Sequence, residues 1–180
     1  MALGLHLVEY KSQKDGPYEE IGCGAASLMM LLRHHVLPIR VPSYPQLCEC
    51  LWLMVDPEIK GWARSNGRGA FTTDVERALR GMKSRNSDQI QFSRIEEADP
   101  ERALRLITKA LKLGPVMSTM KGKGFGAGEG HWIVVTGLQD GGLQCRDPWH
   151  NKRRSLSLVE FRKHWDGDAF FLTHPCKCAT

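Results

Sequence analysis

The sequence lacks any run of about 18 uninterrupted apolar residues, the length that a membrane-spanning helix needs. The N-terminal segment, residues 1–10, holds no basic region followed by a long apolar one, so no secretory signal is expected. No internal repeat is found along the chain. We therefore expect a protein without a membrane span, located in the cytoplasm or delivered to a target cell without a signal peptide.

Cys-x-x-Cys pairs, the usual signature of a zinc site, are also missing. The six cysteines instead include two Cys-x-Cys pairs, Cys48/Cys50 and Cys176/Cys178. That spacing is weak evidence for a metal, because residues i and i+2 of a helix point apart. The chain is also long for a scaffold held by disulfides. We predict no metal and no cofactor, and the sequence leaves open whether these four cysteines have a function.

Dense basic clusters are equally scarce, although the formal net charge is +5. The longest cluster is Lys152 to Arg154, and the other basic residues are scattered. The glycine-rich stretch 121–130 lacks the Lys-Ser/Thr pair of a phosphate-binding loop. We therefore expect no nucleic-acid or nucleotide partner, and the modest positive excess favours an acidic target over a basic one.

The composition supports one ordinary globular domain. The 180 residues, of which 42% are hydrophobic, suffice for a substantial core, so we expect a single domain over 1–180 with a flexible tail at about 175–180. We predict an α+β fold in which a helix-rich N-terminal half packs on an antiparallel sheet from the C-terminal half. Expected helices span 24–37, 43–54, 74–82, 99–113 and 157–165. Expected strands span 89–95, 116–120, 131–138, 143–146 and 169–173, after a short strand or extended lead-in at 4–13.

Local signals place the ends of several helices. Pro38 ends the first helix, which is apolar on nearly every side and is therefore expected to be buried. Ser43 caps the second helix, with Pro45 in its first turn. Thr72 or Thr73 is the expected cap of the third.

Cys23 lies at the start of the first expected helix, between Gly22 and Gly24. The unpaired N–H groups of a helix N-terminus stabilise a thiolate, which lowers the pKa of the thiol. Flanking glycines would let a substrate backbone approach closely. The alternative is a buried cysteine that acts as a small apolar residue.

His131 and Asp147 could supply a base and the carboxylate that orients it. His131 begins the strand 131–138, and Asp147 ends the strand that returns from the turn at 140–142. For each residue a structural role is the alternative, since Asp before Pro commonly starts a turn.

The hairpin between these strands tests their pairing. A two-residue turn at Asp140-Gly141 would place His131 and Asp147 on opposite faces of the sheet. An odd loop, or a bulge such as Gly141-Gly142 can provide, would place them on one face. A His–Asp pair therefore requires one of these irregularities.

Gln13 precedes Cys23 by ten residues. Its side-chain amide could point at an oxyanion beside the backbone N–H of Cys23. From spacing alone, a solvent-exposed glutamine is the more common outcome.

Several stretches resemble a known family. "VEYKSQKDGPYEEIGCGAASLMMLL" is similar to the N-terminal motif of the bacteriocin-processing (double-glycine leader) peptidase-like branch of papain-like cysteine peptidases. "GHWIVVTGL" and "CRDPW" resemble its second motif, and "SLVEFRKHW" resembles the helix that commonly follows. The resemblance covers about residues 7–30 and 130–166, whereas the middle of the chain, 38–115, matches no family that we can name.

The resemblance implies a cysteine peptidase that hydrolyses a peptide or protein amide bond through a thioester. Cys23 would be the nucleophile, His131 the base, Asp147 the orienting group and Gln13 part of the oxyanion hole. Gly22, Gly130 and Trp132 would contact the substrate.

Two other readings of the same residues remain open. The triad could serve a glutamine deamidase, an acyltransferase or a peptidoglycan amidase of a bacterial toxin or effector, or the fold could be a binding module without catalysis. The middle segment would supply one wall of the cleft, with Trp52, Trp62 and Phe125 as lining or core residues. Substrate, cleavage site and oligomeric state are not fixed by the sequence.

Overall fold

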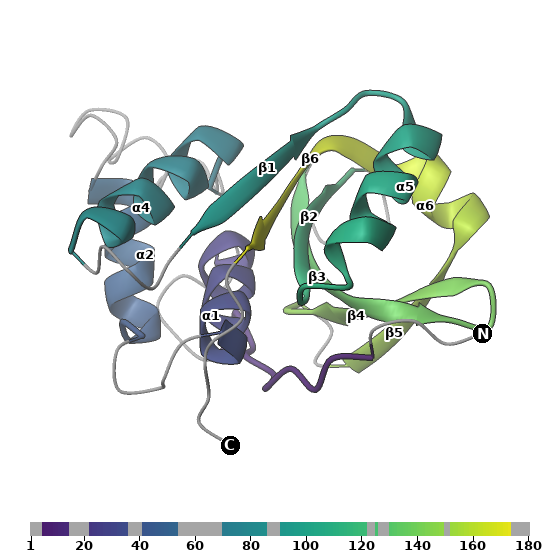
Figure 1. Cartoon of the computed structure of the whole chain (residues 1–180). Helices are drawn as coiled ribbons and strands as arrows, with labels where there is room; N and C mark the ends of the chain where they lie inside the picture. Colours follow the sequence, from purple (N-terminus) through teal and green to yellow (C-terminus); the bar gives the residue numbers. More distant parts are fainter. Residues whose placement is uncertain are drawn as a thin grey trace, which may run out of the picture.

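The structure is a computed structural model that describes residues 5–14, 22–35, 41–53, 70–85, 91–121, 125, 130–149 and 152–173. The helices in these ranges are α1 (Cys23–His35), α2 (Tyr44–Leu53), α4 (Thr72–Arg85), α5 (Pro100–Ala110) and α6 (Leu158–His164). The strands are β1 (Phe92–Glu96), β2 (Val116–Met120), β3 (His131–Gln139), β4 (Gly142–Asp147), β5 (Lys152–Ser157) and β6 (Trp165–Leu172). The predicted α+β arrangement, helices first and strands later, is confirmed (Figure 1).

The six strands form one antiparallel sheet in the order β1-β6-β2-β3-β4-β5. Helices α1, α2 and α4 lie on one side of this sheet, and α5 and α6 lie on the other (Figure 1). Each side has its own hydrophobic core, so the sheet is apolar on both faces in its centre. No helix in the described ranges is long and apolar enough to cross a membrane.

Helix α1 is the centre of the helical side. Its residues from Cys23 to Leu32 are all buried, because the helix lies between the sheet and the pair α2 and α4 (Figure 1). A helix that is apolar nearly all round requires such an environment, and the predicted burial is confirmed. Pro38, its predicted stop, lies outside the described residues.

The predicted starts of α2 and α5 lie within one residue of the observed ones, whereas the predicted cap of α4 is wrong and α5 ends at Ala110 rather than at 113. Asp99 caps α5 by accepting from the N–H of Glu101 at 2.9 Å. Helix α4 begins at Thr72 itself, so neither Thr72 nor Thr73 is its cap. Asp74 instead accepts from the N–H of Phe71 at 3.0 Å, because a carboxylate in the first turn can reach back over the helix start.

Two strands differ from the sequence prediction. Strand β5 was missed, since its run of basic residues lacks a clear apolar alternation. Strand β6 begins at Trp165 rather than at 169, where the apolar residues start. Helix α6 lies between these two strands, and the capping box of Ser157 and Glu160 forms its N-terminus.

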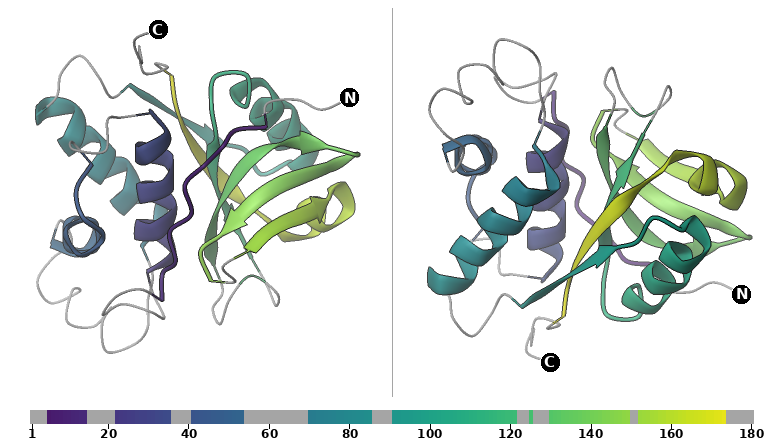
Figure 2. Two further views of the ribbon diagram at one scale, coloured as in Figure 1. Left: turned by 90° about the horizontal axis from the view of Figure 1, so that it is seen from below. Right: turned by 90° about the horizontal axis from the view of Figure 1, so that it is seen from above.

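The lead-in 5–14 is extended but forms no strand. It runs between α1 and the sheet, where Val8 packs against Met30 and Val134 (Figure 2). The N–H of His6 donates to the carbonyl oxygen of Thr136 at 2.8 Å. The lead-in therefore passes beside β3 before it approaches the start of α1.

The β3–β4 hairpin has a two-residue turn and a bulge. Asp140 and Gly141 both have positive φ angles, 52° and 74°, as a type I′ turn requires. The strands keep one register from the turn to Gly137 and another from Val135 onward. Thr136 is therefore an extra residue in β3, a β-bulge.

This bulge restores the pairing that the His–Asp hypothesis needs. Val134 lies opposite Arg146, and the same register brings His131 and Asp147 to one face of the sheet. The expected position of the bulge, Gly141-Gly142, is wrong, because those residues lie within and beside the tight turn. The expectation that an irregularity must exist is confirmed.

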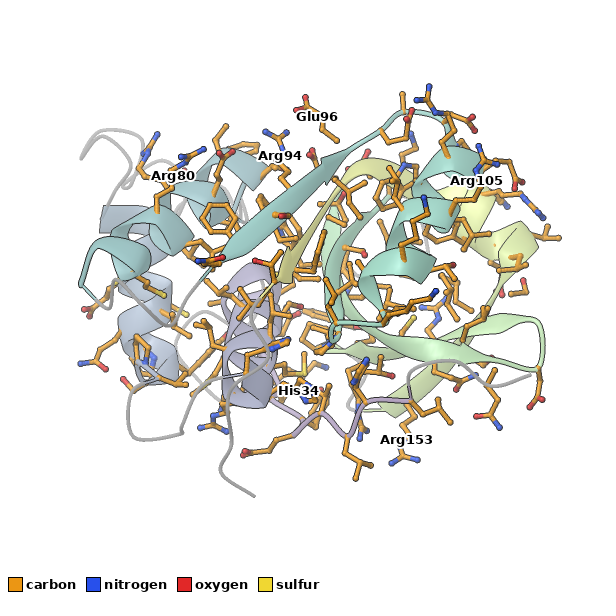
Figure 3. All side chains as sticks on the ribbon, viewed as in Figure 1. His34, Arg80, Arg94, Glu96, Arg105 and Arg153 are labelled. Carbon is orange, nitrogen blue, oxygen red and sulfur yellow. The ribbon has the colours of Figure 1, made fainter. Side chains whose placement is uncertain are left out.

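A network of charged residues joins the helical side to the edge of the sheet. Arg94 of β1 pairs with Asp168 of β6 at 2.7 Å and with Glu76 of α4 at 3.4 Å. Glu76 also pairs with Arg80 at 2.5 Å. Arg80 and Arg94 lie near one another along this edge (Figure 3).

Ser27 joins α1 to the centre of the sheet, because its hydroxyl donates to the backbone oxygen of Trp132 at 3.1 Å. We predict that Ser27→Ala lowers the free energy of unfolding by about 1 kcal/mol, since a buried acceptor loses its donor. Urea unfolding followed by circular dichroism measures this change. Ser93→Ala on the edge strand β1 is the control, and equal stability of the two variants would contradict the assignment.

Candidate active site

The N-terminus of α1 places Cys23 at the junction of the helical side and the sheet. The residue is 6% exposed. The carbonyl oxygen of Gly22 accepts from the N–H of Ala26 at 2.9 Å, which starts the first helical turn at Cys23. Gly24 packs so tightly that an added Cβ would lie 2.9 Å from the Cβ of Ala70. The glycine that follows the thiol is therefore required by packing.

His131, the first residue of β3, joins Cys23 and Asp147. Its Nε2 lies 2.8 Å from Oδ1 of Asp147. Its side chain also lies close enough to the Cys23 thiol for the two groups to shift each other's pKa. The three predicted side chains thus form one continuous chain from the helix to the far strand of the hairpin.

Asp147 is fully buried at the end of β4. Besides His131, its Oδ1 accepts from the N–H of Trp149 at 2.9 Å, and its Oδ2 lies 3.6 Å from Nη1 of Arg154. The turn that follows Asp147 is thus tied to the carboxylate, so Asp147 starts a turn and holds the imidazole at once. The expected turn is confirmed, and the catalytic role of Asp147 stays a prediction.

The two reactive groups shift each other's pKa. Burial alone would raise the pKa of the Cys23 thiol, but the side chain and charge of His131, together with the backbone groups of Trp132 and Gly24, outweigh burial and lower it. Burial alone would lower the pKa of His131, yet its bonds to Asp147 and Cys23 raise it to about 9. Burial without such a partner raises the pKa of Cys48 and of Cys145 to about 12. The partner, rather than burial, therefore sets Cys23 apart.

Gln13 is 1% exposed, so the solvent-exposed alternative for this residue is wrong. Its N–H donates to the carbonyl oxygen of Pro148 at 3.1 Å. Its own carbonyl oxygen accepts from the hydroxyl of Tyr44 at 3.1 Å, and the same hydroxyl reaches the carbonyl oxygen of Gly22 at 3.4 Å. One phenol thus holds the backbone of Gln13 beside that of Gly22, the residue before the thiol.

Two residues at this site were missed by sequence reasoning. Tyr44 begins α2 and bridges two carbonyl groups, and nothing in its local sequence indicates this contact. Arg154 lies in the missed strand β5, within the short basic cluster of Lys152 to Arg154, for which no role was predicted.

The predicted substrate contacts lie in different surroundings. Gly22 is buried beneath Cys23, and Gly130 is exposed beside His131. Trp132 is 3% exposed, and its Nε1–H donates to the carbonyl oxygen of Ala70 at 2.9 Å, so its indole packs in the core. Their role in substrate binding stays a prediction.

The candidate lining residues are only partly described. Phe125 is 1% exposed and belongs to the core beside α5 and α6. Trp62 and the Cys176/Cys178 pair lie outside the described residues, as does the side chain of Trp52. The described residues contain no group of three or more His, Cys, Asp or Glu side chains that could hold a metal ion.

Comparison of this chain with known proteins gives one family and a set of similar structures. Residues 6–170 match the Peptidase_C39 like family. No curated protein sequence matches the chain.

Three solved structures are similar over nearly their whole length. The double glycine motif protease of an AMS/PCAT transporter, solved with its leader peptide, has a TM-score of 0.60 at 18% identity, covering 96% of this chain and 97% of that chain. The peptidase domain of Streptococcus ComA has a TM-score of 0.63 at 20% identity, with 94% and 99% covered. A Bacillus anthracis protein proposed to be a C39-like peptidase has a TM-score of 0.66 at 14% identity, with 98% and 100% covered.

These likenesses support the papain-like fold, and the family match covers both stretches that carry the sequence resemblance. The resemblance to the double-glycine leader branch is thereby confirmed. The chain belongs to the Peptidase_C39 like family and is a cysteine-dependent peptidase.

Proposed function

We propose that this protein hydrolyses a peptide amide bond with Cys23 as nucleophile, His131 as general acid and base, and Asp147 as the group that orients His131. One observation carries the proposal. The thiol is buried, yet its pKa is lowered, because His131 contacts it and Asp147 supports His131 at 2.8 Å. A thiolate–imidazolium pair is the form that attacks a carbonyl without prior proton transfer.

The reaction proceeds in two steps. The thiolate attacks the carbonyl carbon, a C–S bond forms, and the C–N bond breaks as His131 gives its proton to the leaving amine. A water molecule then attacks the thioester while His131 takes its proton. The C–S bond breaks, the carboxylic acid product leaves, and the imidazolium–thiolate pair is restored.

The oxyanion of each tetrahedral intermediate needs donors beside Cys23. The backbone N–H of Cys23, at a helix N-terminus, is one candidate. The side-chain amide of Gln13 is the other, because Tyr44 fixes the backbone of Gln13 beside Gly22. A peptide substrate fits this arrangement, and one structural relative was solved with a leader peptide. The positive net charge favours an acidic peptide.

Cleavage is tested with a peptide library prepared from a proteome digest. The wild-type chain is expected to generate new peptide termini, which mass spectrometry identifies, and Cys23→Ala is expected to generate none. The variant is matched in fold because alanine is a conservative replacement for a buried thiol. New termini of equal number with both proteins would contradict the assignment of Cys23.

The pKa shifts predict the pH dependence of kcat/KM on a peptide so identified. Activity needs the thiolate, so it rises as pH passes the pKa of Cys23, which lies below the usual 9.0. It also needs the imidazolium, so it falls as pH passes the pKa of His131, about 9. An alkaline limb near 6.5, the ordinary value for histidine, would show that the Asp147 contact does not act on His131.

Gln13→Ala is expected to lower kcat by roughly 10²-fold or more, because one oxyanion donor is lost, while KM changes little. The pH limbs should stay in place, since Cys23, His131 and Asp147 are retained. Gln91→Ala, at an exposed glutamine just before β1, is the matched control. Unchanged kcat in Gln13→Ala would remove this residue from the oxyanion hole.

A further inference from the structure

A second cation lies behind the proposed triad. Arg154 faces Cys145 across the β4–β5 ladder, and Cys145 is buried in the core beside α5 and α6. The Arg154 side chain is 27% exposed, and its Nη1 lies 3.6 Å from Oδ2 of Asp147. A guanidinium on the inner face of a strand costs free energy unless an anion balances it, and Asp147 is that anion.

An aromatic ring holds the guanidinium in this place. The Cζ atom of Arg154 lies 4.1 Å from the ring centroid of Phe125, a cation–π contact. Phe125 in turn lies 5.0 Å from the ring of His164, measured between centroids. The N–H of Lys121 donates to the carbonyl oxygen of His164 at 2.7 Å, which fastens the start of the glycine-rich stretch to α6.

Among the described residues, the charges of the site sum to zero when Arg154 is included, whether Cys23 and His131 are both neutral or both charged. A Cys23 thiolate, a His131 imidazolium and an Asp147 carboxylate sum to −1, in a site where each residue is at most 6% exposed. The guanidinium brings the sum to zero. Buried charges are costly unless they are paired, so a neutral set is the more stable arrangement.

Two further titratable groups near Arg154, Cys145 and Glu160, do not provide this positive charge. Cys145 of β4 stays a neutral thiol, because burial raises its pKa to about 12. Glu160 of α6 is held by the Ser157 hydroxyl and N–H, which lower its pKa, with a smaller effect of Arg154. Neither group supplies a positive charge to Asp147.

We propose that Arg154 is a positioning residue of the active site, whose guanidinium pairs with Asp147 and favours the ionised forms of Asp147 and Cys23 while His131 is an imidazolium. This inference rests on the proposed triad. It adds a fourth member, held by Phe125, to the line of charges that runs from α1 to β5.

The sign of the expected effect follows from the charge alone. Removing a positive charge makes nearby groups hold their protons more tightly, so the pH at which Cys23 becomes a thiolate must rise. For a charge acting through a partly buried site, a rise of roughly half a pH unit or more is expected.

The test is the pH profile of iodoacetamide alkylation at Cys23, measured by mass spectrometry over roughly pH 4 to 10, the range in which cysteine thiols titrate. Arg154→Gln removes the charge but keeps an amide donor for Asp147, so folding is preserved. Arg154→Lys keeps the charge. Arg153→Gln removes the same charge from the exposed neighbour, whose side chain points away from the sheet (Figure 3).

We expect the midpoint of the Cys23 alkylation profile to move to higher pH in Arg154→Gln alone. In Arg154→Lys and Arg153→Gln the midpoint should stay within about 0.2 pH units of the wild type. An equal midpoint in Arg154→Gln and Arg153→Gln, or equal shifts in the Gln and Lys variants of Arg154, would overturn it. Wild-type Cys23 that reacts no faster than Cys50 at pH 6 would instead overturn the triad itself. Circular dichroism of each variant verifies that it is folded.

Discussion

The contact of buried His131 with Cys23 and Asp147, which in the proposed mechanism carries a thiolate–imidazolium pair, is the interaction on which the rest of this structure depends. Each charge alone would be driven to its neutral form by burial, which opposes the lowered pKa of Cys23 and the raised pKa of His131. Asp147, 0% exposed, opposes the effect of burial on His131, because its Oδ1 lies 2.8 Å from Nε2 of His131. The helix and the strands that carry these residues must therefore be held in fixed positions relative to each other.

Several contacts within the fold hold these elements in place. Ser27 bonds the buried helix α1 to the backbone of β3, and Tyr44 bridges the lead-in to the residue before the thiol. The bulge at Thr136 sets His131 and Asp147 on one face despite a two-residue turn. The bulge residue is also hydrogen-bonded, since the Thr136 hydroxyl donates to the carbonyl oxygen of Gln144 and the Thr136 carbonyl oxygen accepts from the N–H of His6. The site is thus assembled from local devices spread across both halves of the chain.

Much of this could be predicted from sequence, where a residue pattern has one physical meaning. An apolar run of Ala, Leu and Met predicts a buried helix, and Cys23 between two glycines at its start marks the reactive end. The parity of the hairpin predicts that an irregularity must exist, but not its position, because many residues can form a bulge. The roles of Tyr44 and Arg154 could not be predicted from the sequence. Gly22 lies 22 residues from Tyr44 and Asp147 lies 7 residues from Arg154, and only the fold brings these partners into contact.

The most direct test of the account is the protonation state of His131, followed by NMR in protein labelled at histidine, with His131→Ala used to assign its signals. The account predicts an imidazolium at neutral pH that titrates with a midpoint of about 9. It also predicts that Asp147→Asn lowers this midpoint, because the carboxylate that raises it is gone. A wild-type midpoint at or below 6.5, unchanged in Asp147→Asn, would contradict the buried ion pair and the mechanism built on it.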